Sequence, residues 1–308
     1  MTSVRIPDEN DTDMRLGRRT VRLTNLSKPF WPHVAKRDLL QYYSDVATAV
    51  IPHVADRPMV MKRYPNGYRG EYFFMKRAPA QRPAWIRLCP VEHGSGSSID
   101  FPIVRDVASL LWMVNLGCID LNPWYATCDD IERPDFLHFD LDPVKPATFE
   151  HVLETALVIR GLLDAIDVPS FAKTTGSRGM HIYVPIVRQP TSRQVWETAK
   201  SIALRLARDH PKLITAVYRV AERPRGLVLV DYNQNALGRT LASVYSVRPR
   251  PRATVSAPVT WREVERGVRI EDFRIDNMVE RIRRKGELWA PLLARRNRVP
   301  LRRLTDAY

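Results

Sequence analysis

The stretch FLHFDLDP at residues 136–143 decides the fold expected of this chain, because its residues alternate between the two faces of one strand. His138, Asp140 and Asp142 share one face, and the hydrophobic residues between them share the other. Proline cannot donate a hydrogen bond to a neighbouring strand, so Pro143 predicts that the strand ends directly after the two carboxylates. Two carboxylates at this spacing can bind one hard divalent cation or bridge two. The same pattern is equally consistent with two solvated carboxylates on an exposed strand face.

A second acidic strand end, LVLVD at residues 227–231, adds a third carboxylate. If the two strands are neighbours, Asp231 completes a site with room for phosphate oxygens. Three carboxylates without a cation would repel one another, so a divalent cation is the natural partner of such a group. The two strand ends together therefore predict metal-dependent chemistry on a phosphate-bearing substrate.

The segments around these strand ends alternate regularly between strand and helix patterns. The order strand, helix, strand, strand, helix, strand is that of an RRM-like or ferredoxin-like sheet. The first half of the chain mixes both patterns, so we expect a mixed α+β fold in which an RRM-like sheet module packs on an N-terminal α/β module. The expected helices cover residues 36–50, 107–116, 148–166 and 192–209, and the expected strands residues 20–26, 58–64, 72–75, 136–143, 170–173, 180–186 and 227–231.

The net charge of +14 and the isoelectric point near 10.0 indicate a polyanionic partner, either nucleic acid or an anionic membrane surface. No apolar stretch approaches the roughly 20 residues that cross a bilayer. The acidic, polar residues 1–13 do not have the pattern of a signal peptide. These observations favour nucleic acid over a membrane, and the cytoplasm as the compartment.

The three cysteines, Cys89, Cys118 and Cys128, show no CxxC spacing and are odd in number. This pattern argues against both a zinc site and a disulfide framework. We therefore expect three reduced, mostly buried thiols, as is usual in a reducing cytoplasm.

The segment KTTGSRGMH at residues 173–181 predicts a turn with two glycines, several hydroxyl groups and one guanidinium, that of Arg178. Exposed backbone N–H groups and this cation together make a cradle for a triphosphate, and His181 can donate to a phosphate oxygen. An ordinary β-hairpin explains the turn equally well, and a Walker A loop is excluded because no GK[ST] opens a helix here. The amides of DYNQN at residues 231–235 suit hydrogen bonds to sugar or base, or simple capping and turn formation.

Four segments, HFDLDP (138–143), KTTGSRGMHIYVP (173–185), LVDYNQNALGRT (229–240) and YSVRPRPRATVSAPVTW (245–261), resemble the polymerase domain of bacterial ligase D, in the archaeo-eukaryotic primase superfamily. The resemblance extends from about Val21 to about Arg284, with no accompanying ligase or nuclease domain, so the chain is similar to a stand-alone primase-polymerase paralogue. It implies a catalytic domain of two packed modules at 19–290. The polar, non-periodic residues 1–18 predict a flexible tail before it, and the arginine-rich residues 291–308 a basic tail after it.

The resemblance also implies roles for individual residues. Asp140, Asp142 and Asp231 match the catalytic carboxylates that bind two divalent ions, Mn²⁺ or Mg²⁺. Thr175 stands where the family usually has serine, and Asn122 where it commonly has a histidine. The residues expected at the nucleotide are His138, Thr175, Ser177, Arg178, Gly179, His181, Gln234 and Arg248. The residues expected at DNA are Lys28 and Lys36, on a 5′-phosphate, Phe74, stacked on template bases, and Lys62 and Arg63, along the same groove.

The implied activity is that of a DNA-dependent polymerase or primase that uses NTP or dNTP, favours ribonucleotides, and fills gaps or extends ends in DNA repair by non-homologous end joining. Its partners would be gapped or end-containing DNA with a 5′-phosphate, and a separate ligase or Ku, in the nucleoid of a bacterial cytoplasm. One alternative is a glycosyltransferase, which also uses DxD; the charge of +14, the 173–181 turn and Asp231 argue against it. The other is a DNA-end-binding module without catalysis, which the three intact carboxylates argue against.

Overall fold

The computed structural model describes residues 3–92 and 96–306 and contains two compact units, each assembled from three segments of the chain. Unit 1 comprises Met1–Ile131, Thr240–Val255 and Arg274–Gly286. Unit 2 comprises Glu132–Arg239, Ser256–Phe273 and Glu287–Tyr308. The ends of the two expected tails, residues 1–2 and 307–308, lie outside the described residues.

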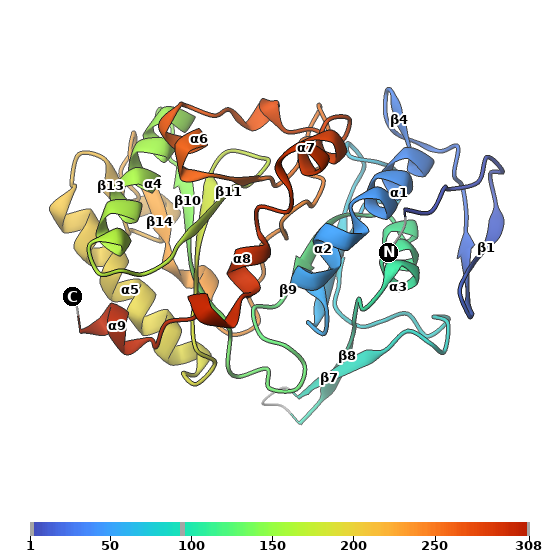
Figure 1. Cartoon of the computed structure of the whole chain (residues 1–308), viewed down its shortest axis with the longest axis horizontal. Helices are drawn as coiled ribbons and strands as arrows, with labels where there is room; N and C mark the ends of the chain where they lie inside the picture. The colour runs from blue at the N-terminus through green and yellow to red at the C-terminus, as the bar shows by residue number, and fades with distance from the viewer. Residues whose placement is uncertain (1–2, 93–95, 307–308) are drawn as a thin grey trace. The chain divides into compact units, whose positions relative to one another are not determined.

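Unit 2 is built on a six-stranded sheet with the strand order β13-β14-β10-β12-β11-β15 (Figure 1). The predicted strand at 136–143 is β10, and it lies between β14 and β12 with antiparallel pairing on both sides. Its central position explains why its hydrophobic face is fully buried. The strands are β10 (Phe136–Pro143), β11 (Phe171–Thr174), β12 (Met180–Pro185), β13 (Ile214–Thr215), β14 (Val228–Asp231) and β15 (Pro258–Val259).

Two long helices pack on this sheet, α4 (Phe149–Asp164) against β10 and β12, and α5 (Ser192–Asp209) against β10 and β13. Helix α5 begins where predicted because the Thr191 hydroxyl accepts a hydrogen bond from the N–H of Gln194, an N-cap. The chain order β10-α4-β11-β12-α5-β14 and the spatial order β14-β10-β12-β11 confirm the predicted ferredoxin-like arrangement.

The C-terminal segment expected as a basic tail is folded onto unit 2 as far as residue 306. Leu292, Val299 and Leu304 are buried, and Val299 forms a β-bridge with Ile186. These apolar residues recur between the arginines, so one side of the segment is apolar and packs against the unit. The high content of arginine alone did not indicate this. The short helices of unit 2 are α6 (Trp261–Glu265), α8 (Ala290–Leu293) and α9 (Arg302–Thr305).

Unit 1 contains a three-stranded sheet of order β6-β5-β9, with α3 packed against β9 and α1 packed against α3. The helix expected at 36–50 is two helices, because the backbone leaves the helical region at Val46 (ψ 6°) and restarts. The elements are α1 (Lys36–Asp45), α2 (Ala47–Val54), β5 (Met59–Arg63), β6 (Phe73–Met75), α3 (Val107–Asn115), β9 (Cys118–Pro123) and α7 (Met278–Lys285).

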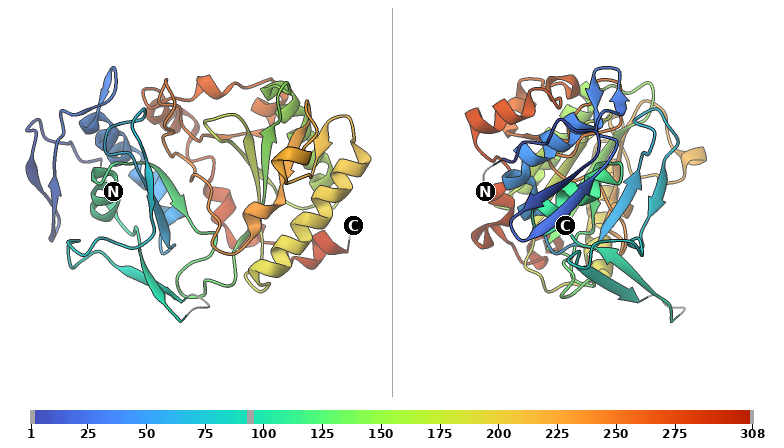
Figure 2. Two further views of the ribbon diagram at one scale, coloured as in Figure 1. Left: turned by 180° about the vertical axis from the view of Figure 1, so that it is seen from behind. Right: turned by 90° about the vertical axis from the view of Figure 1, so that its right-hand side faces the viewer.

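Three hairpins complete unit 1, and Figure 2 shows the β1–β2 and β7–β8 ribbons apart from the three-stranded sheet. The segment 1–18 was expected to be a flexible tail, but Thr12–Leu16 is strand β1, paired antiparallel with Arg19–Leu23 (β2). Met14 and Val21 face each other in this pair and are buried, so an apolar contact holds the ribbon down. The other hairpins are β3 (Pro29–Trp31) with β4 (Val34–Ala35) and β7 (Leu88–Glu92) with β8 (Ser98–Pro102).

The expectation of three reduced cysteines is wrong, because Cys89 and Cys128 form a disulfide while Cys118 is a free, buried thiol. Cys89 belongs to an apolar cluster of unit 1 that includes Phe101 and Trp124, and Cys128 packs against the same cluster. The shared cluster brings together two residues that are 39 positions apart in the chain, which their spacing could not indicate.

No helix within residues 3–92 and 96–306 is both long and apolar enough to span a lipid bilayer.

Candidate active site

Three carboxylates lie together on two neighbouring strands of unit 2. Asp140 of β10 is paired directly with Asp231 of β14, so both side chains project from the same face of the sheet, with Cβ atoms about 5 Å apart. Asp142 is two residues further along β10 and shares this face. Asp140 and Asp231 are buried, whereas the Asp142 side chain is 33% exposed. The predicted convergence of the two acidic strand ends is therefore present in the fold.

Each carboxylate on β10 contacts a cationic or proton-donating side chain from β12 or the turn before it. His181 Nε2 lies 3.1 Å from Asp140 Oδ1, and Arg178 Nη2 lies 3.5 Å from Asp142 Oδ1. Asp140 and His181 are directly paired across the sheet, which fixes their contact.

The third carboxylate, Asp231, caps the 3₁₀ helix η2 (Tyr232–Asn235) that follows it. Its Oδ1 accepts from the N–H of Asn233 at 2.9 Å, and its Oδ2 accepts from Gln234 Nε2 at 3.1 Å. The capping group is therefore the Asp231 carboxylate itself, and not one of the amides of the DYNQN segment. Gln234 is thus hydrogen-bonded directly to one of the three carboxylates.

Mutual repulsion is visible at Asp142, whose pKa is raised to about 6. Burial is the largest cause, followed by the negative charge of Asp140, and Asp231 raises the pKa further, while Arg178 and Arg223 lower it. The protein therefore concentrates negative charge here at a cost, which a divalent cation would offset.

The chemistry of this donor set fits Mn²⁺ or Mg²⁺, since both prefer carboxylate oxygens. In the part of the chain that the structure describes, no three His, Cys, Asp or Glu side chains already converge into a metal-binding cluster. The three carboxylates instead contact protein donors, those of His181, Arg178 and Gln234.

The turn between β11 and β12 is organised around the hydroxyl of Thr175. Its Oγ1 accepts hydrogen bonds from three successive N–H groups, those of Ser177, Arg178 and Gly179, each at 3.1 Å. The predicted cradle of N–H groups exists, but its donors converge on a side-chain oxygen of the same turn. A Cβ on Gly179 would lie 1.8 Å from the Leu141 carbonyl oxygen, so only glycine lets the turn approach β10 this closely.

His138, expected at the nucleotide, lies in the core of unit 2. Its ring is stacked on Tyr183, with centroids 5.3 Å apart, and its pKa is well below the ordinary value because of burial and then the charge of His181. Its backbone N–H donates to Asn235 Oδ1 at 3.0 Å, and its carbonyl accepts from Asn235 Nδ2 at 2.8 Å. Asn235 thus continues the pairing of β10 beyond the last residue of β14, a role that the sequence analysis did not assign.

Lys173, also missed by sequence analysis as a site residue, is 1% exposed on β11. Its Nζ lies 2.7 Å from His181 Nδ1 and 2.7 Å from Ser256 Oγ. The lysine was visible in the KTTGSRGMH motif, but the strand pattern gives no signal that its ammonium is enclosed.

The residues expected at DNA lie in unit 1, together with exposed aromatic rings. The Lys62 ammonium lies over the rings of Tyr64, Tyr72 and Phe74, at 5.2, 4.2 and 5.7 Å from their centroids. Phe74 is 60% exposed, and the Arg63 guanidinium lies over Phe73. Stacking surfaces with adjacent cations are typical of single-strand nucleic-acid binding.

Lys28 and Lys36 differ in their surroundings. Lys28 Nζ donates to Asn66 Oδ1 at 2.9 Å near the surface, whereas Lys36 is buried and its Nζ donates to the Thr24 carbonyl at 2.6 Å. The pKa of Lys36 is lowered to about 8, first by burial and then by the positive charge of Lys28. Two ammonium groups that repel each other are a suitable site for one anion.

Arg248 also lies in unit 1, so it is not part of the carboxylate-bearing unit. Its Nε is 3.6 Å from Oδ2 of Asp120, a carboxylate that is 2% exposed. Asn122, which replaces the expected histidine, is buried and donates to the Asp120 carbonyl at 3.3 Å.

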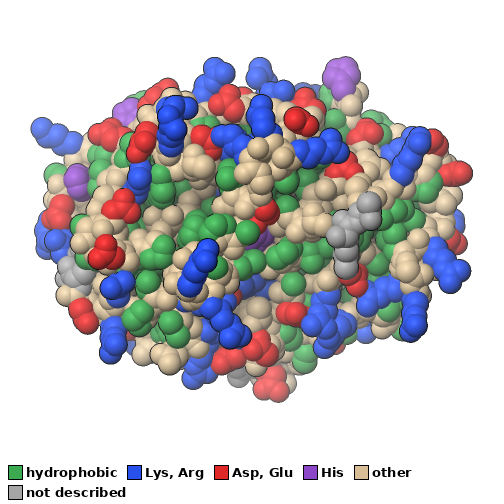
Figure 3. Space-filling view, in the orientation of Figure 1, with side chains coloured by type: hydrophobic (Ala, Val, Ile, Leu, Met, Phe, Trp, Pro, Cys, Tyr) green, Lys and Arg blue, Asp and Glu red, His purple; other side chains and the backbone are tan. Residues whose placement is uncertain are grey.

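The positive charge of the chain is unevenly divided. Unit 1 has 25 Lys and Arg against 16 Asp and Glu, and unit 2 has 23 against 18. On the face seen in Figure 3 the basic side chains are interspersed with acidic ones. The surplus therefore belongs mainly to the unit that carries the residues expected at DNA.

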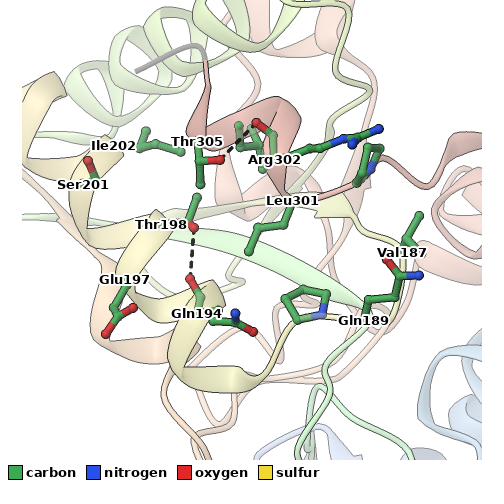
Figure 4. A pocket seen from close by; sticks show the side chains of 13 residues that line it. Val187, Gln189, Gln194, Glu197, Thr198, Ser201, Ile202, Leu301, Arg302 and Thr305 are labelled. Atoms are coloured by element: carbon green, nitrogen blue, oxygen red, sulfur yellow. Dashed lines mark hydrogen bonds between the residues drawn. The ribbon is translucent and has the colours of Figure 1, made fainter.

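A separate pocket of about 780 Å³ lies in unit 2 between α5 and the segment that ends in α9. Figure 4 shows Gln194 and Thr198 of α5 on one side and Leu301 and Thr305 on the other. None of the residues predicted to bind nucleotide or metal lines it.

Comparison with known proteins identifies the relatives of this chain. A family model described as "LigD, primase-polymerase domain" matches residues 35–289. The multifunctional non-homologous end joining protein LigD of Mycolicibacterium smegmatis is 33% identical over 276 residues, which cover 88% of this chain and 36% of that protein. The bifunctional non-homologous end joining protein LigD of Bacillus subtilis is 30% identical over 252 residues, covering 82% of this chain and 40% of that protein.

A solved structure, the polymerase domain from Mycobacterium tuberculosis ligase D in complex with DNA, matches 88% of this chain and 97% of its own, with 31% identity and a TM-score of 0.82. The chain thus spans about two fifths of the length of the full relatives and nearly all of the polymerase domain. These matches confirm the predicted resemblance, the mixed α+β fold and the nucleotidyltransferase class.

Proposed function

Because the chain belongs to the LigD primase-polymerase domain family, we propose that it extends DNA strands in a template-directed, metal-dependent reaction. Its substrates would be NTP or dNTP, with ribonucleotides preferred, and its task would be gap filling or end extension in non-homologous end joining, with a separate ligase or Ku as protein partner. The names of the relatives and the DNA bound to the solved polymerase domain support this proposal. The observation that carries it is the direct pairing of Asp140 with Asp231, beside Asp142.

Asp140, Asp142 and Asp231 would hold two divalent cations, Mn²⁺ or Mg²⁺. Bound there, the cations would lower the pKa of a 3′-hydroxyl and offset negative charge on the α-phosphate and the leaving pyrophosphate. To hold them, Asp140 and Asp142 would give up their contacts with His181 and Arg178. This change leaves both donors to the phosphates of the nucleotide.

The triphosphate would lie against the turn at residues 175–179. Its N–H groups already converge on one oxygen acceptor, and beside them lies the guanidinium of Arg178, whose side chain is 61% exposed. Gln234 and Ser177 would complete nucleotide binding within unit 2. The choice between ribose and deoxyribose is tested by competing NTP against dNTP in one reaction.

DNA would bind to unit 1 through the rings and cations around Lys62. Stacking of a template base on Phe74 suits its exposure, and Lys62 and Arg63 supply phosphate contacts. A 5′-phosphate beyond the gap would lie at Lys28 and Lys36, where it would relieve the repulsion that lowers the Lys36 pKa. The unmutated protein should then prefer a gap with a 5′-phosphate over one with a 5′-hydroxyl, and Lys28→Ala with Lys36→Ala should abolish this preference alone.

Primer extension with Mn²⁺ on gapped, nicked and unprimed DNA tests the proposal. Asp140→Ala, Asp142→Ala and Asp231→Ala should each abolish nucleotide addition while leaving DNA binding largely intact, and Asp209→Ala, on the surface of α5, serves as the control. Near-normal extension by Asp142→Ala would reject the two-metal assignment. Equal use of the two gapped substrates by the unmutated protein would reject the phosphate site.

A further inference from the structure

A chain of hydrogen bonds inside unit 2 connects the segment before β15 to the carboxylate Asp140. The Ser256 hydroxyl donates to the Thr174 carbonyl at 2.9 Å, so its oxygen is left to accept from Lys173 Nζ at 2.7 Å. The same ammonium lies 2.7 Å from His181 Nδ1, and His181 Nε2 lies 3.1 Å from Asp140 Oδ1.

An ammonium group has donors and no acceptor, so the short Lys173–His181 contact requires Nδ1 to be the hydrogen-bond acceptor. A neutral imidazole that accepts at one nitrogen carries its proton on the other. A doubly protonated ring is excluded while the lysine is charged, because two donors would then face each other. The proton of His181 is therefore on Nε2, and it points to Asp140.

We propose that Lys173 is a positioning residue that fixes His181 in the Nε2–H tautomer, so that the imidazole always presents a donor on the side of the catalytic carboxylates. The proposal rests on the proposed function only for the identity of the ligand, a nucleotide triphosphate, whose phosphate oxygen receives this donor once Asp140 no longer does. With the opposite tautomer, a nitrogen lone pair would face both the carboxylate and the phosphate, and both contacts would be repulsive.

The rigid placement of Lys173 supports this role. The residue pairs directly with His181 across β11 and β12, and its side chain is enclosed together with Ser256, which is fully buried. Enclosed ammonium groups are costly unless each donor is used, so a buried lysine at this point serves the groups it contacts and not a solvent-facing function. Phosphate recognition by lysine needs exposure of the ammonium, which Lys173 does not have.

The tautomer can be observed directly by NMR of protein labelled with ¹⁵N in histidine, because protonated and bare ring nitrogens resonate in well-separated ranges. The spectrum of His181 is assigned from its loss in His181→Gln. The unmutated protein at neutral pH should show a protonated Nε2 and a bare Nδ1. A protonated Nδ1 in the unmutated protein would overturn the proposal without any variant, and therefore also if a variant fails to fold.

Lys173→Met, which keeps the length of the side chain and removes its donors, should shift the Nδ1 signal of His181, because that nitrogen loses its hydrogen-bond donor while Asp140 still accepts from Nε2. Lys200→Met is the matched control, since that ammonium lies over Trp196 on α5 of the same unit. Ser256→Ala, which retains the lysine, should shift the His181 signals less than Lys173→Met. An unchanged His181 spectrum in folded Lys173→Met contradicts the proposal.

Steady-state kinetics test whether the His181 tautomer affects nucleotide binding. Loss of one fixed donor to a phosphate oxygen should raise the KM for nucleotide roughly tenfold in Lys173→Met and change kcat much less. An unchanged KM beside an altered tautomer would overturn the positioning role. If the unmutated protein does not extend primers at all, the proposed function fails, whereas the tautomer is still decided by the NMR spectrum.

Discussion

Replacing Asp142 by asparagine should make the protein more stable at pH 8, although it removes a proposed metal ligand. The carboxyl group lies beside Asp140 and Asp231, and its pKa is raised to about 6 from an ordinary 3.8, first by burial and then by these two charges. At pH 8 the group is ionised in a place that disfavours the charge. Asparagine has nearly the same shape and remains neutral at every pH.

The sign follows from linkage between protonation and folding. Because the folded-state pKa lies above the unfolded one, the folded protein holds the proton more tightly than the unfolded chain. This stabilisation is complete below pH 3.8 and is lost as the pH rises through 6. A difference of about 2 pKa units corresponds to about 3 kcal/mol for a fully enclosed group. Since the side chain is 33% exposed, solvent screening reduces the expected gain of Asp142→Asn to about 1 kcal/mol at pH 8.

Urea unfolding of both proteins at pH 8 and pH 4.5, without divalent cations, measures this difference. We expect a gain of about 1 kcal/mol, or a rise in Tm of about 3 °C, at pH 8 and a gain of only about 0.3 kcal/mol at pH 4.5. Asp209→Asn is the control, because hydrogen bonding to Arg208 lowers the pKa of Asp209 and its replacement should not stabilise the protein at pH 8. A variant that is no more stable than the parent at pH 8, or equally more stable at both pH values, would refute the reasoning.

Three further predictions concern the turn, the disulfide and the charge. Gly179→Ala should lower the free energy of unfolding by about 3 kcal/mol or more, because its Cβ would lie 1.8 Å from the Leu141 carbonyl oxygen, whereas Gly161→Ala, with nothing within 4 Å, should raise it by about 0.5 kcal/mol; urea unfolding of both checks this. Cys128→Ser should destabilise the protein by up to about 4 kcal/mol without reductant and not at all with it, so equal stability in non-reducing urea titrations would contradict the cross-link to Cys89. Affinity for duplex DNA, measured by fluorescence anisotropy, should fall with a slope of about 0.9 log units per log unit of salt for each phosphate contacted, and a flat response would assign the positive charge another purpose.

The sequence predicted the elements of unit 2 well because their signals are local. Pro143 ends β10 as expected, and the alternation before it matches a central strand. Helix α5 has its predicted bounds because Thr191 and Gln194 form a capping box at its start. In unit 1 the apolar periodicity continued through Val46 although the backbone there is not helical, so two helices were read as one.

Site residues could be predicted where the residue type alone indicates the chemistry. They could not be predicted where the role depends on burial of the side chain. The three aspartates could be grouped from their residue type and their positions on apolar strands, whereas the antiparallel register that sets Asp140 opposite Asp231 comes from the structure. Lys173 could not be distinguished from a solvated lysine, because its burial depends on Ser256, far along the chain. Cys89 and Cys128 were likewise separated by chain that gives no sign of their common apolar cluster.

The discontinuity of the two units has a consequence for synthesis of the chain on the ribosome. Tyr42 and Tyr43 of α1 are completed by a segment made much later, since the Tyr42 hydroxyl donates to the Tyr245 carbonyl and the Tyr43 hydroxyl accepts from the N–H of Val247. Leu121 of β9 likewise donates to the Ser246 hydroxyl. The first 131 residues therefore emerge with buried polar groups whose partners do not yet exist. Unit 1 can complete its folding only after residue 286 has emerged. By then the strands β10 to β14 of unit 2 have already been synthesised, so the sheet of unit 2 can fold before unit 1 does.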